Sequence, residues 1–285
     1  MADLGTILTA VVTPFDADGR VDEDGFVRLL GHLAENGSDG AVVAGTTGEA
    51  STLDDDEHIA LVKLAVDEAP DGFTIIAGTG SNDTRHAVKL TAKATEVGAD
   101  AILSVTPYYN RPNRRGIVAH YGEVARSTDL PILLYNIPVR TGTDMPNDLL
   151  AELAQIDNIV GVKQANNDNL AIVDGLLLYA GNDDVLAKTL DLGGSGGILV
   201  ASHIVGPEMR RMVDEPENRD AIHEGLLPVF DALVSPAASS TKAALDLMGL
   251  PGGVPRLPYV PADETEIAAI RTMLEARGLV GVATS

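Results

Sequence analysis

Eight short hydrophobic segments recur along the first 205 residues, and each is followed by a stretch that reads as a helix. The segments are continuously apolar rather than alternating, which is typical of parallel strands that are covered on both faces. We therefore predict strands at Ile7–Phe15, Gly40–Thr46, Phe73–Gly80, Ala101–Tyr109, Pro131–Pro138, Ile159–Ala165, Leu176–Asp183 and Gly196–His203.

The segments between these strands carry helix signals. Asp22–Ala34 has apolar residues at helical spacing, and Ser51–Glu68 opens on two hydroxyl residues before its apolar positions begin. No glycine-rich G-x-G-x-x-G turn follows the first strand, as an open dinucleotide-binding sheet would require. Eight unbroken strand–helix units therefore predict an α/β fold of the (β/α)8 TIM barrel type.

After Val205 the pattern changes to helices alone. We divide the chain into a (β/α)8 barrel over residues 1–220 and a C-terminal helical extension over residues 221–285 that packs on the barrel. A small second domain is the alternative, although a segment of this length is short for an independent core. The predicted helices are Pro207–Asp214, Arg219–Leu233, Ser239–Met248 and Ala262–Arg277.

Composition removes several classes of function. The 285 residues include no cysteine, which excludes disulfides, thiolate nucleophiles and cysteine-based metal sites. The net charge of −22 would repel nucleic acid. The N-terminus lacks a basic stretch before an apolar one, and no run of about 18 apolar residues occurs, so we expect a cytoplasmic protein with no membrane partner. The acidic excess fits either a salt-adapted source or merely an acidic surface.

In a barrel of this kind, catalytic groups sit where the strands end. Lys163 interrupts the apolar run of strand 6, so burial should lower the pKa of its ammonium and make a neutral amine available to attack a carbonyl. The protonated imine would then act as an electron sink. Alternatively, Lys163 is a strand-end lysine that reaches solvent or pairs with a carboxylate.

Polar residues at the neighbouring strand ends favour the catalytic interpretation. Tyr135 ends strand 5 and can bring a phenol near the lysine nitrogen, although a strand tyrosine can also be a packing residue. Thr46 and Thr47, between glycines, offer hydroxyl and N–H groups for a small carboxylate, or they form a capped turn. Arg140 is a candidate bidentate clamp for a second carboxylate, or a surface arginine.

Together these motifs resemble the dihydrodipicolinate synthase family, within the pyruvate-dependent Schiff-base aldolases that include N-acetylneuraminate lyase. The similarity runs from about Ile7 to Ile204, and the C-terminal helices fit more loosely. The motifs that carry it, in chain order, are Thr9-Ala10-Val11-Val12-Thr13-Pro14-Phe15, Gly45-Thr46-Thr47-Gly48-Glu49, Val105-Thr106-Pro107-Tyr108-Tyr109-Asn110-Arg111-Pro112, Tyr135-Asn136-Ile137-Pro138, Arg140-Thr141-Gly142 and Gly161-Val162-Lys163.

The resemblance implies a lyase that condenses pyruvate, held on Lys163, with L-aspartate 4-semialdehyde to form 4-hydroxy-tetrahydrodipicolinate for lysine and diaminopimelate synthesis. Tyr135 would shuttle protons, and Thr46 would connect it to Tyr109 from a neighbouring subunit of a homotetramer built from dimers. No cofactor and no metal is implied, and the six histidines show no ligand spacing. The substrate-binding residues would be Thr47, Arg140, Gly181 and Ile198.

Departures from the family pattern leave the acceptor aldehyde open. Ala50, Gln164 and Asn182 replace the usual residues of their loops, and the segment near Lys242 is altered. The alternatives are another pyruvate-dependent aldolase, a 2-keto-3-deoxy sugar-acid aldolase or dehydratase, or a non-catalytic binding module. At the family's lysine-inhibition site, His86 stands in place of an acidic residue, which predicts weak feedback inhibition.

Overall fold

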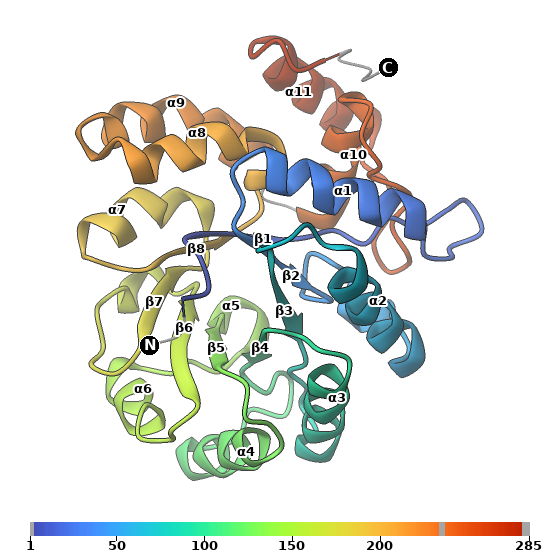
Figure 1. Cartoon of the computed structure of the whole chain (residues 1–285). Helices are drawn as coiled ribbons and strands as arrows, with labels where there is room; N and C mark the ends of the chain where they lie inside the picture. The colour runs from blue at the N-terminus through green and yellow to red at the C-terminus, as the bar shows by residue number, and fades with distance from the viewer. Residues whose placement is uncertain (1–2, 234–236, 281–285) are drawn as a thin grey trace.

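The computed structural model describes residues 3–233 and 237–280 of the chain. Eight parallel strands pair in chain order, and β8 pairs back with β1, so the sheet closes into the predicted barrel (Figure 1). The strands are β1 Ile7–Ala10, β2 Gly40–Val43, β3 Thr74–Gly78, β4 Ala101–Val105, β5 Ile132–Asn136, β6 Ile159–Gln164, β7 Leu177–Ala180 and β8 Gly196–Leu199.

The strands begin within one residue of their predicted starts but end earlier than predicted. β1 stops at Ala10 rather than Phe15, and β4 stops at Val105 rather than Tyr109. The predicted tails are polar or contain proline, and their backbone leaves the ladder; Tyr109, for example, has a φ of +73°. These shortened tails form the loops at the C-terminal end of the barrel.

The helices follow the strands around the outside of the barrel (Figure 1). The predicted helix Ser51–Glu68 is wrong in one respect: it is divided into a 3₁₀ turn, η1, and helix α2, because the Asp54 side chain caps the N-terminus of α2 in a capping box with Glu57. The helices that flank the strands are α1 Glu23–Glu35, η1 Ala50–Thr52, α2 Asp55–Glu68, α3 Thr84–Glu96, α4 Arg114–Arg126, α5 Pro138–Thr141, α6 Asn147–Leu153, η2 Asn167–Asn169, η3 Asp183–Val185 and α7 Leu186–Asp191.

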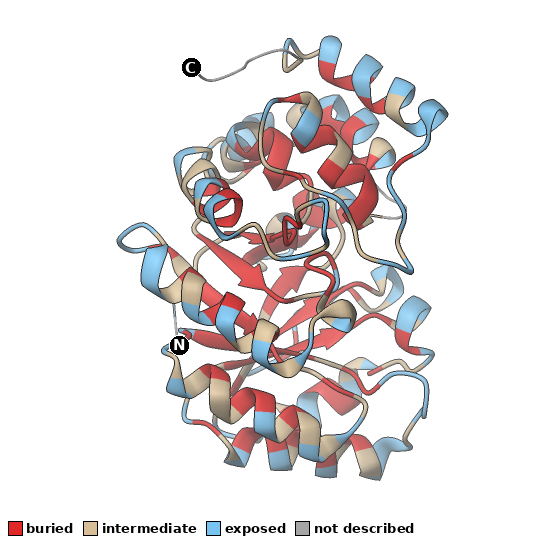
Figure 2. Ribbon diagram, turned by 90° about the vertical axis from the view of Figure 1, so that its right-hand side faces the viewer, coloured by how far each residue is buried: buried red, intermediate tan, exposed pale blue. Residues whose placement is uncertain are grey.

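Two hydrophobic clusters form the core. The larger lies between the strands and the surrounding helices, and the smaller fills the barrel interior with residues such as Leu8, Ile76 and Tyr179. The strands are drawn mostly in the colour of buried residues in Figure 2. Close strand packing requires Gly40, where a Cβ atom would lie 2.4 Å from the carbonyl oxygen of Thr74. The barrel is thus a packed core, and space for ligands is left at its end.

Helix α8, Ser202–Asp214, follows β8 and completes the barrel, beginning five residues before its predicted start. Three further helices follow: α9 packs on α8, and α11 packs on α9 and α10. The division of the chain at residue 220 stays a prediction, and residues 1–2, 234–236 and 281–285 of the two predicted units lie outside the described residues. The remaining elements are η4 Pro216–Asn218, α9 Arg219–Ala232, α10 Ala237–Leu247 and α11 Glu264–Glu275.

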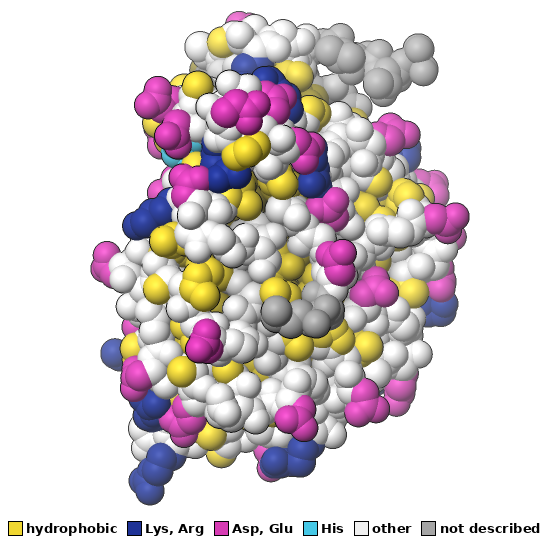
Figure 3. Space-filling view, turned by 60° about the vertical axis from the view of Figure 1, so that its left-hand side comes forward, with side chains coloured by type: hydrophobic (Ala, Val, Ile, Leu, Met, Phe, Trp, Pro, Cys, Tyr) yellow, Lys and Arg dark blue, Asp and Glu magenta, His cyan; other side chains and the backbone are white. Residues whose placement is uncertain are grey.

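Acidic side chains are spread over the face of the molecule that Figure 3 shows, with hydrophobic side chains between them. This distribution matches a sequence with 42 acidic and 20 basic residues. None of the helices in the described ranges is long and apolar enough to span a bilayer.

Candidate active site

The loops at the C-terminal end of the barrel enclose two cavities of about 450 and 430 Å³. Both cavities are lined by Lys163, Tyr135, Thr46 and Arg140, so the two volumes meet at these side chains. The chain therefore brings four of its predicted site residues, from β6, β5, α5 and the loop after β2, to one place. Tyr259, from the C-terminal extension, also lines both cavities.

Lys163 lies near the end of β6, and its residue is only 5% exposed. Burial lowers the pKa of Lys163 to about 8, against the opposing effect of Asp183, and the positive charge of Arg140 lowers it further. In the described part of the chain, Lys163 forms no ion pair with a carboxylate. The interpretation of Lys163 as a solvent-reaching or ion-paired lysine is therefore wrong, and a sizeable fraction of its amine is neutral near pH 8.

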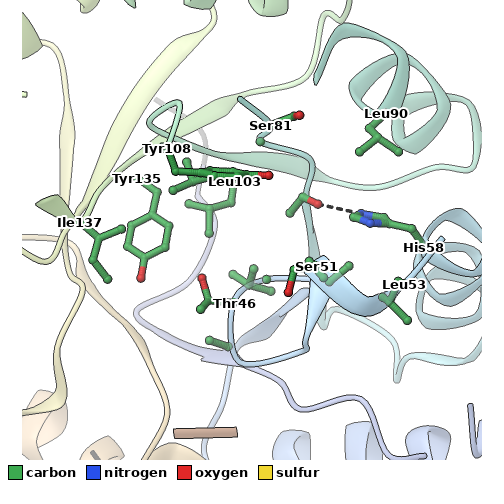
Figure 4. A pocket seen from close by; sticks show the side chains of 18 of the residues that line it. Thr46, Ser51, Leu53, His58, Ser81, Leu90, Leu103, Tyr108, Tyr135 and Ile137 are labelled. Carbon is green, nitrogen blue, oxygen red and sulfur yellow. Dashed lines mark hydrogen bonds between the residues drawn. The ribbon is translucent and has the colours of Figure 1, made fainter. Parts of the chain in front are cut away.

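Tyr135 is the direct neighbour of Lys163 in the β5–β6 ladder, and the Lys163 Nζ atom lies 4.3 Å from the centre of its ring. Burial raises the pKa of Tyr135 to about 12, while the charge of Arg140 and a hydrogen bond with Thr46 oppose that rise. The hydroxyl groups of Tyr135 and Thr46 point toward the same space (Figure 4). The phenol is therefore protonated at neutral pH and can donate a hydrogen bond beside the amine.

Arg140 lies in α5, the single helical turn that follows β5, and it lines both cavities. The ion pairs of the described residues do not include Arg140. Its charge nevertheless acts inside the site, because it lowers the pKa of both Lys163 and Tyr135. An unpaired guanidinium facing a cavity is suited to hold a ligand carboxylate.

The loop after β2 is held by a hydrogen bond within its own backbone and by another from the loop after β1. The N–H of Glu49 donates to the carbonyl oxygen of Thr46 at 3.1 Å, and the hydroxyl of Thr13 donates to the carbonyl oxygen of Gly48 at 2.7 Å. Gly48 is required here, since a Cβ atom would lie 2.9 Å from the carbonyl oxygen of Val11, which follows β1. Thr46 lines both cavities, and Thr47, which is 7% exposed, lines the second.

The remaining predicted residues take different positions. Gly181, after β7, lines the second cavity. The side chain of Ile198 packs in the barrel interior, and Ile198 is not among the residues that line the two cavities. Tyr109 is 88% exposed and is not among the residues that line the two cavities. The functional roles of these three residues stay predictions.

Sequence reasoning missed Asp183 and Tyr259. Asp183 is half-buried beside Lys163 and accepts hydrogen bonds from the N–H groups of Val200 and Ala201 at 3.0 and 2.9 Å. Burial raises the pKa of Asp183, while these two N–H groups and the Lys163 charge oppose the rise. An acidic pair at the end of a predicted strand could have signalled Asp183. Tyr259 had no such signal, because it comes from a proline-rich segment far along the chain.

Histidine and acidic side chains do not gather into a metal site in the ranges 3–233 and 237–280. His58 and His120 lie on helices α2 and α4, as predicted. The ring of His58 is hydrogen-bonded to the carbonyl oxygen of Gly78 at 2.8 Å, the contact drawn in Figure 4.

Comparisons with known proteins agree with this geometry. Residues 3–277 match the Dihydrodipicolinate synthetase family. The 4-hydroxy-tetrahydrodipicolinate synthase 2 of Halalkalibacterium halodurans is 41% identical over 96% of this chain and 98% of its own length. The 4-hydroxy-tetrahydrodipicolinate synthase of Bacillus subtilis is 41% identical over 93% of this chain and 96% of its own length.

A solved structure is similarly close. The chloride-inhibited dihydrodipicolinate synthase from Acinetobacter baumannii, solved as a complex with pyruvate, superposes with a TM-score of 0.93 at 35% identity, covering 97% of this chain and all of that one. The match covers the barrel and the C-terminal helices alike. A buried lysine at the end of β6 of a closed barrel, and relatives alike over nearly their whole length, place this chain in the Dihydrodipicolinate synthetase family.

Proposed function

We propose that this chain is a Schiff-base lyase that condenses pyruvate with L-aspartate 4-semialdehyde to form 4-hydroxy-tetrahydrodipicolinate. The single observation that carries the proposal is the Lys163 amine, buried at the junction of two cavities with its pKa lowered to about 8. The names of the relatives support the acceptor, and the pyruvate complex of the Acinetobacter enzyme supports the donor.

In the first step the neutral amine of Lys163 attacks the ketone carbon of pyruvate, and water leaves as the imine forms. The protonated imine withdraws electrons from the adjacent methyl carbon, which loses a proton to become an enamine. The enamine carbon attacks the aldehyde, and the amino group of the acceptor then attacks the imine carbon, which closes the ring and releases Lys163. The electron sink is the imine itself, so the scheme uses no cofactor and no metal.

Tyr135 is the proton carrier in this proposal. Its hydroxyl is protonated at neutral pH, it adjoins Lys163 in the ladder, and it is hydrogen-bonded with Thr46. A phenol in that position can donate a proton to the departing hydroxyl group during imine formation and recover one afterwards. Thr46 would pass the proton onward to Tyr109.

Two separate groups would bind the two substrates' carboxylates. Thr47, with its hydroxyl and the N–H groups of its loop, would hold the carboxylate of pyruvate, and Gly181 and the backbone of Ile198 would complete that pocket. Arg140, unpaired at the cavity, would hold the carboxylate of the aldehyde substrate. The acceptor is thereby selected by charge as well as by its aldehyde.

Tyr109 would act in a neighbouring site. Tyr109 is 88% exposed, and its backbone has a φ of +73°, a conformation that L-residues rarely adopt. A large aromatic side chain that projects from a site loop is suited to a partner subunit. We propose a dimer in which each Tyr109 enters the other site, and a homotetramer built from two such dimers.

The decisive assay supplies purified protein with pyruvate and L-aspartate 4-semialdehyde and follows product formation, with other aldehydes and keto-deoxy acids measured in parallel. Turnover should be fastest with L-aspartate 4-semialdehyde. Faster turnover of a keto-deoxy sugar acid would move the chain to another branch of the pyruvate aldolases. Arg140→Ala should raise KM for the aldehyde far more than KM for pyruvate.

A further inference from the structure

One buried ion pair lies behind the active-site loop and outside both cavities. The Lys242 Nζ atom of α10 is 2.5 Å from Oε1 of Glu49, and their side chains are 1% and 0% exposed. The second carboxylate oxygen of Glu49 accepts a hydrogen bond from the backbone N–H of Arg256 at 2.9 Å. This single carboxylate therefore joins the barrel to two separate segments of the C-terminal extension.

Stability alone is a poor explanation for this pair. Removing two charges from water costs several kcal/mol for each ion, and replacing a buried pair by apolar residues of similar volume is often neutral or stabilising. The surroundings offset part of that cost, because the Lys242 Nζ atom and the Arg256 guanidinium carbon lie 4.4 and 4.1 Å from the centre of the Phe15 ring. A directional contact in such a place specifies geometry better than an apolar contact would.

Glu49 is bonded to two chain segments that line the active-site cavities. Glu49 has a φ of +57°, and its N–H is bonded to the carbonyl oxygen of Thr46, three residues before it. Its side chain is bonded to Arg256, three residues before Tyr259. Thr46 and Tyr259 both line the two cavities. The carboxylate of Glu49 thus links two walls of the site that are more than 200 positions apart in the chain.

We propose that Glu49 and Lys242 are positioning residues for the proposed reaction: their ion pair holds the loop of Thr46 and Thr47 in the orientation that binds pyruvate. The C-terminal extension then helps to set the geometry of the active site and does more than pack on the barrel. This inference rests on the proposed function, because it takes pyruvate as the ligand of that loop.

The test uses the full-length protein with Glu49→Gln and Lys242→Met combined. The glutamine oxygen can still accept the Arg256 N–H, so the variant removes the charge pair and keeps that backbone contact. The matched control is Asp39→Asn combined with Arg210→Met, a pair 2.6 Å apart that ties α8 to the opposite end of the barrel. The pyruvate concentration that gives half-maximal borohydride-trapped adduct is measured by mass spectrometry, together with kcat/KM for pyruvate and Tm.

We expect kcat/KM for pyruvate to fall by about 10- to 100-fold in the Glu49–Lys242 variant, the size of a small misplacement of a binding group, and the half-saturating pyruvate concentration to rise. The control should lower Tm and leave both pyruvate measurements unchanged. An unchanged half-saturating concentration in a folded Glu49–Lys242 variant would overturn the inference, whereas absence of adduct in the unsubstituted protein would overturn the proposed function.

A second variant guards against misfolding. Glu49→Leu with Lys242→Met replaces the ion pair by an apolar pair, which removes the desolvation cost of two charges but leaves the Arg256 N–H without its acceptor, so the variant should fold with similar stability and still bind pyruvate poorly. Restored pyruvate binding in this variant, or failure of both variants to fold, would show that the pair serves the fold itself and would contradict the proposal.

Discussion

Two sets of charged residues at opposite ends of the barrel, Asp39 with Arg210 and Lys163 with Arg140, differ in their partners. At the N-terminal end, Asp39 accepts hydrogen bonds from the N–H groups of Thr6 and Ile7 at 2.7 and 2.9 Å and pairs with Arg210 at 2.6 Å. At the C-terminal end, Lys163 and Arg140 face the cavities with no carboxylate partner among the described residues.

This difference in pairing distinguishes polar groups whose interactions stabilise the fold from polar groups that are left available to a ligand. A saturated group such as Asp39 contributes its interactions in the folded chain, whereas an unpaired buried amine costs desolvation energy that only a ligand or reaction can offset. Substitution of Asp39 should therefore change stability and leave activity intact, whereas substitution of Lys163 should abolish activity.

The largest expected effect is at Lys163. Lys163→Met should reduce kcat by on the order of 10⁵-fold, the size of loss seen when a nucleophile is removed. Steady-state assays over a range of protein concentrations measure it. Retention of even a tenth of the activity would show that no covalent intermediate forms on this residue.

The same substitution should change stability with a definite pH dependence. Because the folded-state pKa of Lys163 is about 8 and its ordinary value is 10.5, the buried charge destabilises the folded chain below pH 8, and stability rises between the two values. Lys163→Met should therefore increase the free energy of unfolding at pH 7, and this gain should shrink toward pH 10.5. Urea titrations of both proteins across that range test the sign.

Tyr135→Phe comes next in size. It keeps the packing and removes the phenol proton, so kcat should fall by about 10²- to 10⁴-fold, the usual contribution of a general acid–base group. Circular dichroism melting should be nearly unchanged. A variant that loses stability and keeps its kcat would place Tyr135 with the structural groups instead.

Asp39→Ala tests the N-terminal end of the barrel, where a change in stability is expected. Burial would raise the pKa of Asp39, but hydrogen bonds from Arg210, Ile7 and Thr6 hold it below 3.8, so its contribution is present above that pH and is lost as the carboxyl protonates below it. We expect about 1–3 kcal/mol less stability at pH 7. The kcat of the folded fraction should not change, and a loss of kcat would break the division between the two ends.

The smallest expected effect concerns lysine as an inhibitor. At the side of the first cavity, the carboxylate of Asp55 already has two partners, because Lys89 Nζ and His86 Nε2 lie 2.6 and 2.8 Å from it. An added cationic amino acid should bind weakly there. A lysine titration of initial rates is expected to show little inhibition, and half-inhibition at sub-millimolar lysine would contradict this.

Much of this fold was predictable because the periodicity of the strands is local. The continuous apolar runs placed all eight strands in order, and Lys163, Tyr135, Thr46 and Arg140 stood at predicted strand ends. The ends of the strands were not predictable, since Tyr109 leaves the ladder through backbone strain that no apolar pattern reports.

Contacts that depend on tertiary packing were also hidden from the sequence. The Glu49–Lys242 pair joins residues 193 positions apart, and Tyr259 reaches the cavity from a segment with no regular periodicity. Asp183 stood at a predicted strand end, but its two backbone donors from the turn between β8 and α8 depend on tertiary packing. Each of these residues is defined by what folds against it rather than by its neighbours in the chain.

The most direct test of the central claim is reduction with borohydride in the presence of pyruvate, followed by peptide mass spectrometry. We expect one irreversible pyruvate adduct per chain, on Lys163, forming faster as the pH rises through about 8, where its amine becomes neutral. An adduct on another lysine, or no adduct at saturating pyruvate, would contradict it.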